Sequence, residues 1–367
     1  MKSNPIPFLD LARFHRAIKP ELDEAYQRTL SSSTYVLGAE LEAFELEYSK
    51  YVGVDHCIGV ANGLDALYLI LVAYGIGPGD EVIVPSNTFI ATWLAVSRTG
   101  AKIVPVEPRE DTYNLDCSKI EAAISVRTKA IIPVHLYGQI ADMTPIIDLG
   151  LKYGIKVIED AAQSQGATYK GLVSGAIGSA AATSFYPGKN LGAFGDGGAI
   201  TTNDQTLASN LRKLRNYGST VKYSHELLGF NSRLDELQAA FLRVKLKHIN
   251  SINAERKFIA TEYSNNLYGE KITKPIVAAD CEHVWHLYVI QHPNRDQLQK
   301  RLLECGVTTV IHYPEPPHRQ ACYSNYATLS LPICENQAKH ILSLPIFPGM
   351  TSCEIARVID IINNFES

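Results

Sequence analysis

The sequence lacks the features of several protein classes. It has no C-x-x-C pair, and its seven cysteines are scattered and odd in number, which suits neither a disulfide framework nor a zinc site. Reduced thiols in the cytoplasm are the simplest account of them. No apolar run approaches the roughly 20 residues that cross a bilayer, and residues 1–7 lack the apolar stretch of a signal peptide. We therefore expect a cytoplasmic protein without a membrane partner or a metal site.

An excess of charge of one sign is also missing. The chain carries 34 basic and 38 acidic residues, a formal net charge of −4, and no long run of either sign. This balance disfavours nucleic acid as a partner. The basic stretch formed by Arg212, Lys213 and Arg215 could bind phosphate, but the solvated face of a helix is the favoured interpretation.

What the sequence does contain is an alternation of short β-branched runs with helical segments. The expected strands are 56–60, 81–84, 102–106, 130–134 and 156–158, with helices starting near residues 64, 88, 118 and 144. Two amphipathic helices, 20–31 and 40–51, precede them after a short extended arm. The rhythm predicts an α/β fold with a mostly parallel sheet and with chemistry at the carboxyl ends of its strands.

The second half of the chain has a different pattern. Residues 171–202 are rich in Gly, Ala and Ser, and two short strands, 181–185 and 198–201, are expected there. A long helix, 234–267, should follow, and after it strand 286–290, helix 296–304, strand 308–311 and helices 335–342 and 353–364. With 367 residues the chain should hold about two domains. We predict a large domain with the N-terminal arm over 1–250 and a smaller α+β domain over 251–367.

The first candidate binding motif lies where the strand 56–60 ends and a helix begins. Gly63 and Leu64 would present backbone amides at the helix start, which is a favourable place for an anion. An ordinary β-to-α turn is the competing interpretation. A dinucleotide site is not supported, because the glycines at 75–79 follow a helix rather than a strand, and the chain has no P-loop motif.

Two further residues could supply chemistry. Asp160 ends an apolar strand, and a buried carboxylate needs a cationic partner, although Asp is also a common helix N-cap. Lys189 lies in a Gly-rich loop, where partial desolvation would lower its pKa and make it a Schiff-base nucleophile, although most loop lysines are simply solvated. A phosphate anchor, a carboxylate for a pyridine nitrogen and an amine for an aldehyde are together what pyridoxal phosphate requires.

Several segments in one order along nearly the whole chain resemble a known family, the DegT/DnrJ/EryC1/StrS sugar aminotransferases of the fold type I pyridoxal-phosphate enzymes. The segments are residues 7–11 (PFLDL), 59–63 (GVANG), 159–163 (EDAAQ), 188–192 (GKNLG), 195–198 (GDGG) and 231–236 (NSRLDE). The resemblance implies the fold of the type I pyridoxal-phosphate enzymes. It also implies pyridoxal 5'-phosphate as the cofactor.

Carried over position by position, the resemblance implies that Lys189 forms the Schiff base and that Asp160 pairs with the pyridinium nitrogen. Gln163 would lie near the ring hydroxyl and Phe89 would stack on the ring. The groups implied to meet the phosphate are the amides of Gly63 and Leu64, the hydroxyl of Ser184, and Asn231 of a second subunit. A homodimer with shared active sites follows. Without the family, Phe89, Ser184 and Asn231 would be interpreted as core, strand and turn residues.

The segment around Lys189, residues 184–193 (SFYPGKNLGA), resembles the members that aminate C3 of a nucleotide-linked keto-sugar. Tyr186, His312 and Tyr313 are candidates for substrate contact, although a satisfied strand-end histidine is the alternative for His312. We interpret His135 and Tyr137 as structural.

The expected reaction is the transfer of an amino group, from L-glutamate by family analogy, to C3 of a dTDP-3-keto-6-deoxyhexose. The product would be a dTDP-3-amino-3,6-dideoxyhexose of glucose or galactose configuration for a surface glycan. Two alternatives stay open. One is a C4 aminotransferase of a nucleotide-linked 4-keto-sugar, and the other is a non-catalytic regulator on the same fold.

Overall fold

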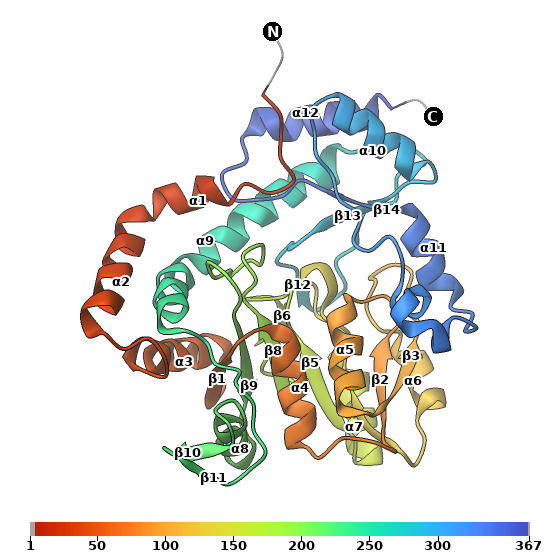
Figure 1. Ribbon diagram of the computed structural model, residues 1–367. Helices are drawn as coiled ribbons and strands as arrows, with labels where there is room; N and C mark the ends of the chain where they lie inside the picture. Colours follow the sequence, from red (N-terminus) through yellow and green to blue (C-terminus); the bar gives the residue numbers. More distant parts are fainter. Residues whose placement is uncertain (1–3, 366–367) are drawn as a thin grey trace.

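A computed structural model describes residues 4–365, and Met1–Ser3 therefore lie outside the described residues. Its centre is a seven-stranded sheet (Figure 1). In chain order the strands are β1 His56–Val60, β2 Glu81–Pro85, β3 Lys102–Val106, β4 Thr128–Ile131, β5 Lys156–Asp160, β8 Ala180–Ser184 and β9 Gly198–Thr202. The spatial order is β1-β9-β8-β5-β4-β2-β3, and only β9 runs antiparallel to its neighbours. The predicted α/β class with a mostly parallel sheet is confirmed.

Helices cover both faces of this sheet, as its almost continuously apolar strands require. One face packs against α4 Gly63–Ala73, α5 Ile90–Thr99 and α8 Gln205–Leu214. The other packs against α3 Ala39–Val52, α6 Cys117–Ala123, α7 Met143–Tyr153 and the first half of α9 Glu236–Asn266. Because side chains alternate along a strand, neighbouring residues of one strand join different cores: Val82 faces α4 and α5, whereas Ile83 faces α7.

The N-terminal helices agree with the prediction apart from one addition. The helix α2, Lys19–Ser32, and α3 cover the expected 20–31 and 40–51. Within the expected extended arm, however, Leu11–Ala17 form helix α1, whose N-cap Asp10 accepts a hydrogen bond from Ala12 N. None of the α1 residues is buried. The sequence therefore lacks the periodic pattern of apolar residues by which the other helices were predicted.

The C-terminal part corrects two predictions. The expected strand 308–311 is wrong: Val310 forms only an isolated bridge with Ser343. The expected helix 335–342 continues too far, because α11 Pro332–His340 ends where β14 Ile341–Leu344 begins, and β14 pairs with β13 Tyr288–Gln291. The remaining helices here are α10 Arg295–Glu304, α12 Ser352–Asn363 and the 3-10 helices η2 Pro317–Arg319 and η3 Ala321–Tyr326.

Other short elements lie outside the main sheet. The strand expected to reach residue 134 ends at Ile131, since Pro133 cannot donate to the ladder. At the start of the small-residue segment, β6 Thr168–Tyr169 and β7 Leu172–Val173 pair with each other, and β6 also pairs with β12 Cys281–Glu282. A hairpin of β10 Ser219–Val221 and β11 Ser224–His225 extends from the body of the molecule, and Leu136–Gly138 form the 3-10 helix η1.

The long helix α9 connects two separate cores. Its residues up to Ile249 pack with α3, whereas Ile259, Ala260 and Tyr263 pack with the C-terminal elements. Ile6 of the N-terminal arm joins the C-terminal core and bridges to Val307. The predicted boundary between 1–250 and 251–367 therefore falls within a continuous helix. The division into two domains stays a prediction. No helix within residues 4–365 is both long and apolar enough to span a bilayer.

Candidate active site

The candidate residues gather where strands of the sheet end and two helices begin. Helix α4 starts directly after β1, and the side chain of Asn62 caps it by accepting a hydrogen bond from Asp65 N at 2.8 Å. The first-turn amides of Gly63 and Leu64 have no partner inside the helix, as at every helix start. This end of the helix carries the positive end of the dipole and suits an anion.

Glycine is required at this helix start because three segments meet there. A Cβ on Gly63 would lie 2.8 Å from the Cβ of Ser184, at the end of β8. A Cβ on Gly198, at the start of β9, would lie 2.4 Å from the carbonyl carbon of Asn62. The structure thus brings the amides of Gly63 and Leu64 and the hydroxyl of Ser184 to one place.

Asp160 ends the neighbouring strand β5 and is buried. Its carboxylate accepts hydrogen bonds from Thr92 Oγ1 at 2.8 Å and from Ala162 N at 3.2 Å. Thr92 in turn lies 2.9 Å from the hydroxyl of Thr88. Burial raises the pKa of Asp160, and the hydrogen bonds and the positive charge of Lys189 offset it only in part. A protonated heterocycle beside Asp160 would lower the free-energy cost of keeping this buried carboxylate charged.

Lys189 lies on the loop after β8, and its backbone amide donates to Tyr186 O at 2.8 Å. Its side chain is half-buried. Burial lowers the pKa of Lys189 to about 8, against the opposing attraction of Asp160. With this pKa about a tenth of the amine is unprotonated at pH 7, far more than for a solvated lysine, and this is the state in which it acts as a nucleophile.

Gln163 and Tyr313 form one polar group beside these residues. Gln163 accepts from Tyr137 N at 2.7 Å and donates to the hydroxyl of Tyr313 at 3.1 Å. The ring of Tyr313 lies 5.5 Å from that of Phe89, which is half exposed. Burial raises the pKa of Tyr313, so its hydroxyl stays protonated. The hydroxyl of Tyr137 donates to His312 O.

His312 belongs to the same side of the site. Its Nδ1 lies 2.9 Å from Ser343 Oγ on β14. Burial, followed by the positive charge of Lys189, lowers the pKa of His312 to about 4. The imidazole is therefore neutral at pH 7 and can form hydrogen bonds but adds no positive charge.

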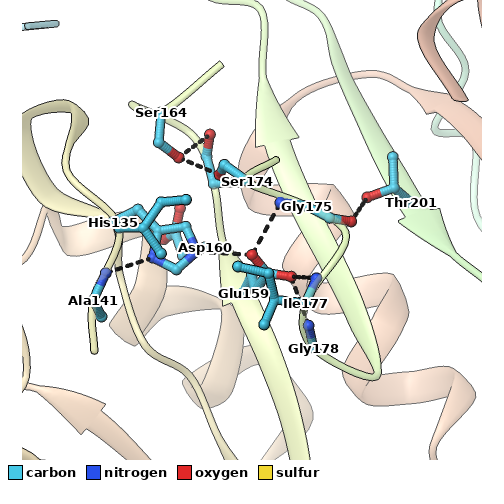
Figure 2. A network of polar contacts seen from close by, with 12 residues as sticks. His135, Ala141, Glu159, Asp160, Ser164, Ser174, Gly175, Ile177, Gly178 and Thr201 are labelled. Atoms are coloured by element: carbon cyan, nitrogen blue, oxygen red, sulfur yellow. Dashed lines mark hydrogen bonds and ion pairs between the residues drawn. The ribbon is translucent and has the colours of Figure 1, made fainter. Parts of the chain in front are cut away.

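A buried pair whose contact the sequence did not predict holds β5 in place. His135 Nε2 lies 2.8 Å from Glu159 Oε2, and both side chains are fully buried (Figure 2). Glu159 also accepts from the amides of Gly175, Ile177 and Gly178. Although burial alone would raise the pKa of Glu159, these contacts lower it.

This pair acts on the site through the backbone. Glu159 and Asp160 are consecutive on β5, so their side chains point to opposite faces of the strand. The amide of His135 donates to Asp160 O at 3.0 Å, and its Nδ1 accepts from Ala141 N at 3.3 Å. The interpretation of His135 as structural agrees with these contacts. The sequence marks Glu159 only as part of the motif 159–163. That motif does not show that His135 is the partner of Glu159.

Two predicted residues lie apart from this group within one chain. Tyr186 is exposed, and Asn231 is exposed and bridges only to Asn216. The next residue, Ser232, donates to Asp65 Oδ2 at 2.9 Å and accepts from Ala61 N at 3.2 Å, so the 231–233 segment borders the start of α4.

The geometry fits pyridoxal phosphate. An amine with a lowered pKa, a buried carboxylate without a full countercharge, and a glycine helix start beside a hydroxyl supply the three contacts that this cofactor needs. Within residues 4–365 no group of three or more His, Cys, Asp or Glu could hold a metal ion.

Comparisons with known proteins agree on one family. Residues 16–363 match the DegT/DnrJ/EryC1/StrS aminotransferase family. The chain is 51% identical to a dTDP-3-amino-3,4,6-trideoxy-α-D-glucose transaminase of Streptomyces venezuelae, over 98% of this chain and 96% of the relative. It is also 51% identical to a dTDP-3-amino-3,6-dideoxy-α-D-galactopyranose transaminase of Aneurinibacillus thermoaerophilus, over 98% and 99% of the two chains.

Solved structures show the same likeness. The structure of DesV of S. venezuelae superimposes with a TM-score of 0.97 at 50% identity and covers 98% of both chains. NtdA of Bacillus subtilis, solved with the bound cofactor PMP, superimposes with a TM-score of 0.92 at 34% identity, over 99% of this chain and 85% of that one.

Proposed function

The chain belongs to the DegT/DnrJ/EryC1/StrS aminotransferase family, and on that premise we propose that it aminates C3 of a dTDP-linked 3-keto-6-deoxyhexose with pyridoxal phosphate as cofactor. The observation that carries the proposal is the pair of transaminases, each 51% identical over 98% of this chain, whose names place the amino group on C3 of a dTDP-linked deoxyhexose. The buried Asp160 and the half-buried Lys189 supply the chemistry that such a reaction needs.

We assign the cofactor contacts as follows. The amides of Gly63 and Leu64 and the hydroxyl of Ser184 would hold the phosphate, since they meet at the positive end of α4. Gln163 would lie near the ring hydroxyl, and Phe89 would cover the ring face. Support for Phe89 comes from its half exposure and its ring contact with Tyr313.

Asp160 and Lys189 divide the catalytic work. Pyridoxal phosphate supplies an aldehyde that exchanges amines and a ring that withdraws electrons from the substrate carbon. Asp160 would hold a proton on the ring nitrogen, with its own position set by Thr92. Lys189 would bind the cofactor in the resting enzyme, and its Nζ, once free, would move the proton between the substrate carbon and the cofactor. Its pKa of about 8 suits both giving and taking a proton near neutral pH.

Tyr186, His312 and Tyr313 remain our candidates for substrate contact. Because His312 is neutral at pH 7, we assign it a hydrogen bond to the sugar rather than an ion pair with the diphosphate. Tyr313 is held by Gln163, so its hydroxyl would couple the substrate side of the site to the cofactor side.

We further propose a homodimer in which Asn231 of one subunit completes the phosphate site of the other. Support comes from the exposure of Asn231 and of the large apolar residues in the preceding hairpin segment, including Leu228, of which 95% is exposed. Such a surface is rarely left in solvent.

The amino donor in this proposal is L-glutamate, and the enzyme works in the cytoplasm. The seven cysteines support a reducing compartment, because none of them forms a disulfide within residues 4–365.

The test is a set of paired nucleotide sugars. With L-glutamate as donor, the purified enzyme should convert dTDP-linked 3-keto-6-deoxyhexoses and should leave the matching 4-keto sugars unreacted. Among the 3-keto sugars, substrates with and without the C4 hydroxyl distinguish the two reactions of the relatives. Preferred turnover of a 4-keto sugar would assign the enzyme to C4. Absence of turnover with every keto-sugar and glutamate would favour a regulator.

A further inference from the structure

The loop that carries Lys189 is a tight, closed turn. The amide of Lys189 donates to Tyr186 O at 2.8 Å, and a Cβ on Gly192 would lie 2.4 Å from Pro187 O. Glycine is therefore needed where the two ends of the turn approach each other. Because the turn is tight, contacts that fix the next residue, Asn190, also fix the backbone of Lys189.

The buried side chain of Asn190 forms hydrogen bonds in three directions. Its Nδ2 donates to Val284 O at 2.9 Å and to Asn253 Oδ1 at 2.8 Å, and its Oδ1 lies 3.3 Å from His286 Nδ1. A backbone carbonyl can only accept, so the nitrogen of the carboxamide must face Val284. The oxygen then faces His286, whose Nδ1 must carry a proton, because an amide oxygen cannot donate.

Asn253, on α9, continues these contacts toward the loop that follows β5. Its Nδ2 donates to Gln165 O at 3.0 Å, and this carbonyl fixes the Oδ1 of Asn253 on the side of Asn190. A Cβ on Gly166 would lie 2.7 Å from Asn253 Nδ2, so the close approach depends on glycine. Two backbone carbonyls thus determine the orientation of both carboxamides.

The two carboxamides connect the segments that hold the proposed catalytic residues. Gln165 belongs to the loop that begins after Asp160, and Asn190 directly follows Lys189. At the other side of Asn190, burial, followed by the positive charge of Lys189, lowers the pKa of His286. His286 is therefore neutral at pH 7 and holds Asn190 without adding a charge that would repel the amine.

We propose that Asn190 and Asn253 are positioning residues for Lys189. Their hydrogen bond braces the Lys189 loop against the loop after Asp160, so that the amine stays near the carboxylate and away from water. Such a brace matters because a misplacement of about 1 Å at a reacting group can lower a rate about 10²-fold. The inference rests on the proposed attachment of the cofactor to Lys189, but not on which keto-sugar the enzyme aminates.

The first measurement is a pH titration of the visible absorbance of the holoenzyme, which changes when the Lys189 nitrogen bonded to the cofactor loses its proton. Burial disfavours the protonated, charged form of this nitrogen. Asn253→Ala frees the loop and admits water, so the midpoint should rise by about one pH unit. Asn250→Ala is the matched control, because Asn250 is an exposed asparagine of the same helix, and its midpoint should equal that of the wild type.

Steady-state kinetics separate positioning from substrate binding. Asn253→Ala should lower kcat by about 10- to 100-fold and change the KM values for the donor and the keto-sugar by less than about threefold. The double variant Asn190→Ala/Asn253→Ala should shift the absorbance midpoint no further than Asn190→Ala alone, because both changes remove the same contact. Additive shifts would show that the two residues act independently and would overturn the inference.

The outcomes distinguish this inference from the proposed function. Unchanged midpoints in Asn190→Ala and Asn253→Ala, beside a wild type that binds the cofactor through Lys189, would overturn the inference alone. A wild type that binds no cofactor at Lys189 would overturn both. If neither variant folds, the crystal structure of the wild-type holoenzyme decides: the carboxamide of Asn190 must donate to Asn253 and Val284, and a carboxamide turned away from them would contradict the brace.

Discussion

At the residue scale, Lys189 combines burial with a nearby carboxylate, Asp160. Burial lowers its pKa to about 8, and the nearby Asp160 limits that fall. The same burial raises the pKa of Asp160. The two groups thus hold an amine that can lose its proton beside a carboxylate that requires a cation, and neither property belongs to the side chain in isolation.

Removing the amine should abolish the reaction. Lys189→Ala should lower kcat by about 10³-fold or more, because both cofactor attachment and proton transfer depend on this nitrogen. Steady-state amine transfer and the visible absorbance of the bound cofactor measure the two effects. Lys50→Ala, which changes an exposed lysine on α3, should behave as the wild type. Full turnover in Lys189→Ala would exclude the assignment.

The glycine at the start of α4 should control cofactor affinity. Gly63→Ala would place a Cβ 2.8 Å from the Cβ of Ser184, so the helix start or the serine must move. Losing one charge-assisted hydrogen bond to phosphate costs roughly 1.5–3 kcal/mol, and we therefore expect the Kd for pyridoxal phosphate to rise by about 10- to 100-fold.

Titration of the apoprotein with cofactor measures this constant. Gly77→Ala is the control, because its Cβ would find its nearest neighbour, Thr99 O, at an ordinary 3.6 Å. Equal cofactor affinity in Gly63→Ala and Gly77→Ala would argue against phosphate binding at this helix start.

At the scale of elements, β5 combines a structural and a chemical task in two consecutive residues. Glu159 points to one face, where His135 and three backbone amides fix it, and Asp160 points to the other. The alternation of the strand is a sequence property. That His135, 24 residues earlier, completes the contacts of Glu159 follows only from the packing of the two segments.

A second contact between elements links helix α1 to the start of α12. Arg13 donates to both carboxylate oxygens of Glu354 at 2.7 Å, and Glu354 also forms a capping box with Thr351. The hydrogen bond from Arg13 lowers the pKa of Glu354 from 4.5 to about 2, and the contacts of Thr351 add to this effect. Burial acts in the opposite direction.

This shift predicts a pH dependence of stability. The unfolded carboxyl titrates near 4.5 and the folded one near 2, so the contribution is complete above pH 4.5 and is lost as pH falls toward 2. At pH 7, Glu354→Gln should lower the Tm by about 2–4 °C, and the difference from wild type should shrink as pH falls below 4.5.

Thermal unfolding between pH 7 and pH 3 tests this expectation. Glu121→Gln is the matched control, since Glu121 pairs with Lys152 on the surface, where such pairs contribute little. A difference between wild type and Glu354→Gln that stays constant over this range would show that the ion pair is not its cause.

At the scale of the whole molecule, the proposed dimer predicts complementation between two defective variants. Lys189→Ala and Asn231→Ala should each have low activity. If the two residues of one site come from different subunits, a mixed dimer of the variants contains one site with both changes and one intact site. Random exchange of subunits in an equal mixture should therefore restore about a quarter of the wild-type activity.

The experiment requires unfolding and refolding together or prolonged mixing of the purified variants, followed by the amine-transfer assay. Mixing either variant with itself is the control. If Lys189 and Asn231 serve the same site from one chain, mixed dimers hold two defective sites, and mixing restores no activity.

The net charge of −4 is a poor description of the surroundings of the Lys189 loop. Lys189, Lys245 and Arg256 lie around one cavity behind the loop, and the start of α4 provides a local positive potential without any side-chain charge. The global balance disfavours nucleic acid as a partner on electrostatic grounds, but it carries no information about local concentrations of positive charge.

The sequence by itself determined the layers of the fold and the order of the motifs. Short β-branched apolar runs locate β1 to β5, and the six segments that include 59–63, 159–163 and 188–192 identify the family. Helix α1 and the absence of a strand at 308–311 could not be read from sequence, because α1 has no buried residue and the segment around Val310 forms only isolated bridges.

Only the tertiary structure decided the electrostatics. Thr92 reaches Asp160 across 68 residues of chain, and the pKa values of Lys189 and His312 depend on burial by segments that are distant in the sequence. Local patterns report which side chains are present and which faces they share. The cost of a charge depends on how much water its neighbours exclude, and those neighbours are chosen by the folded chain as a whole.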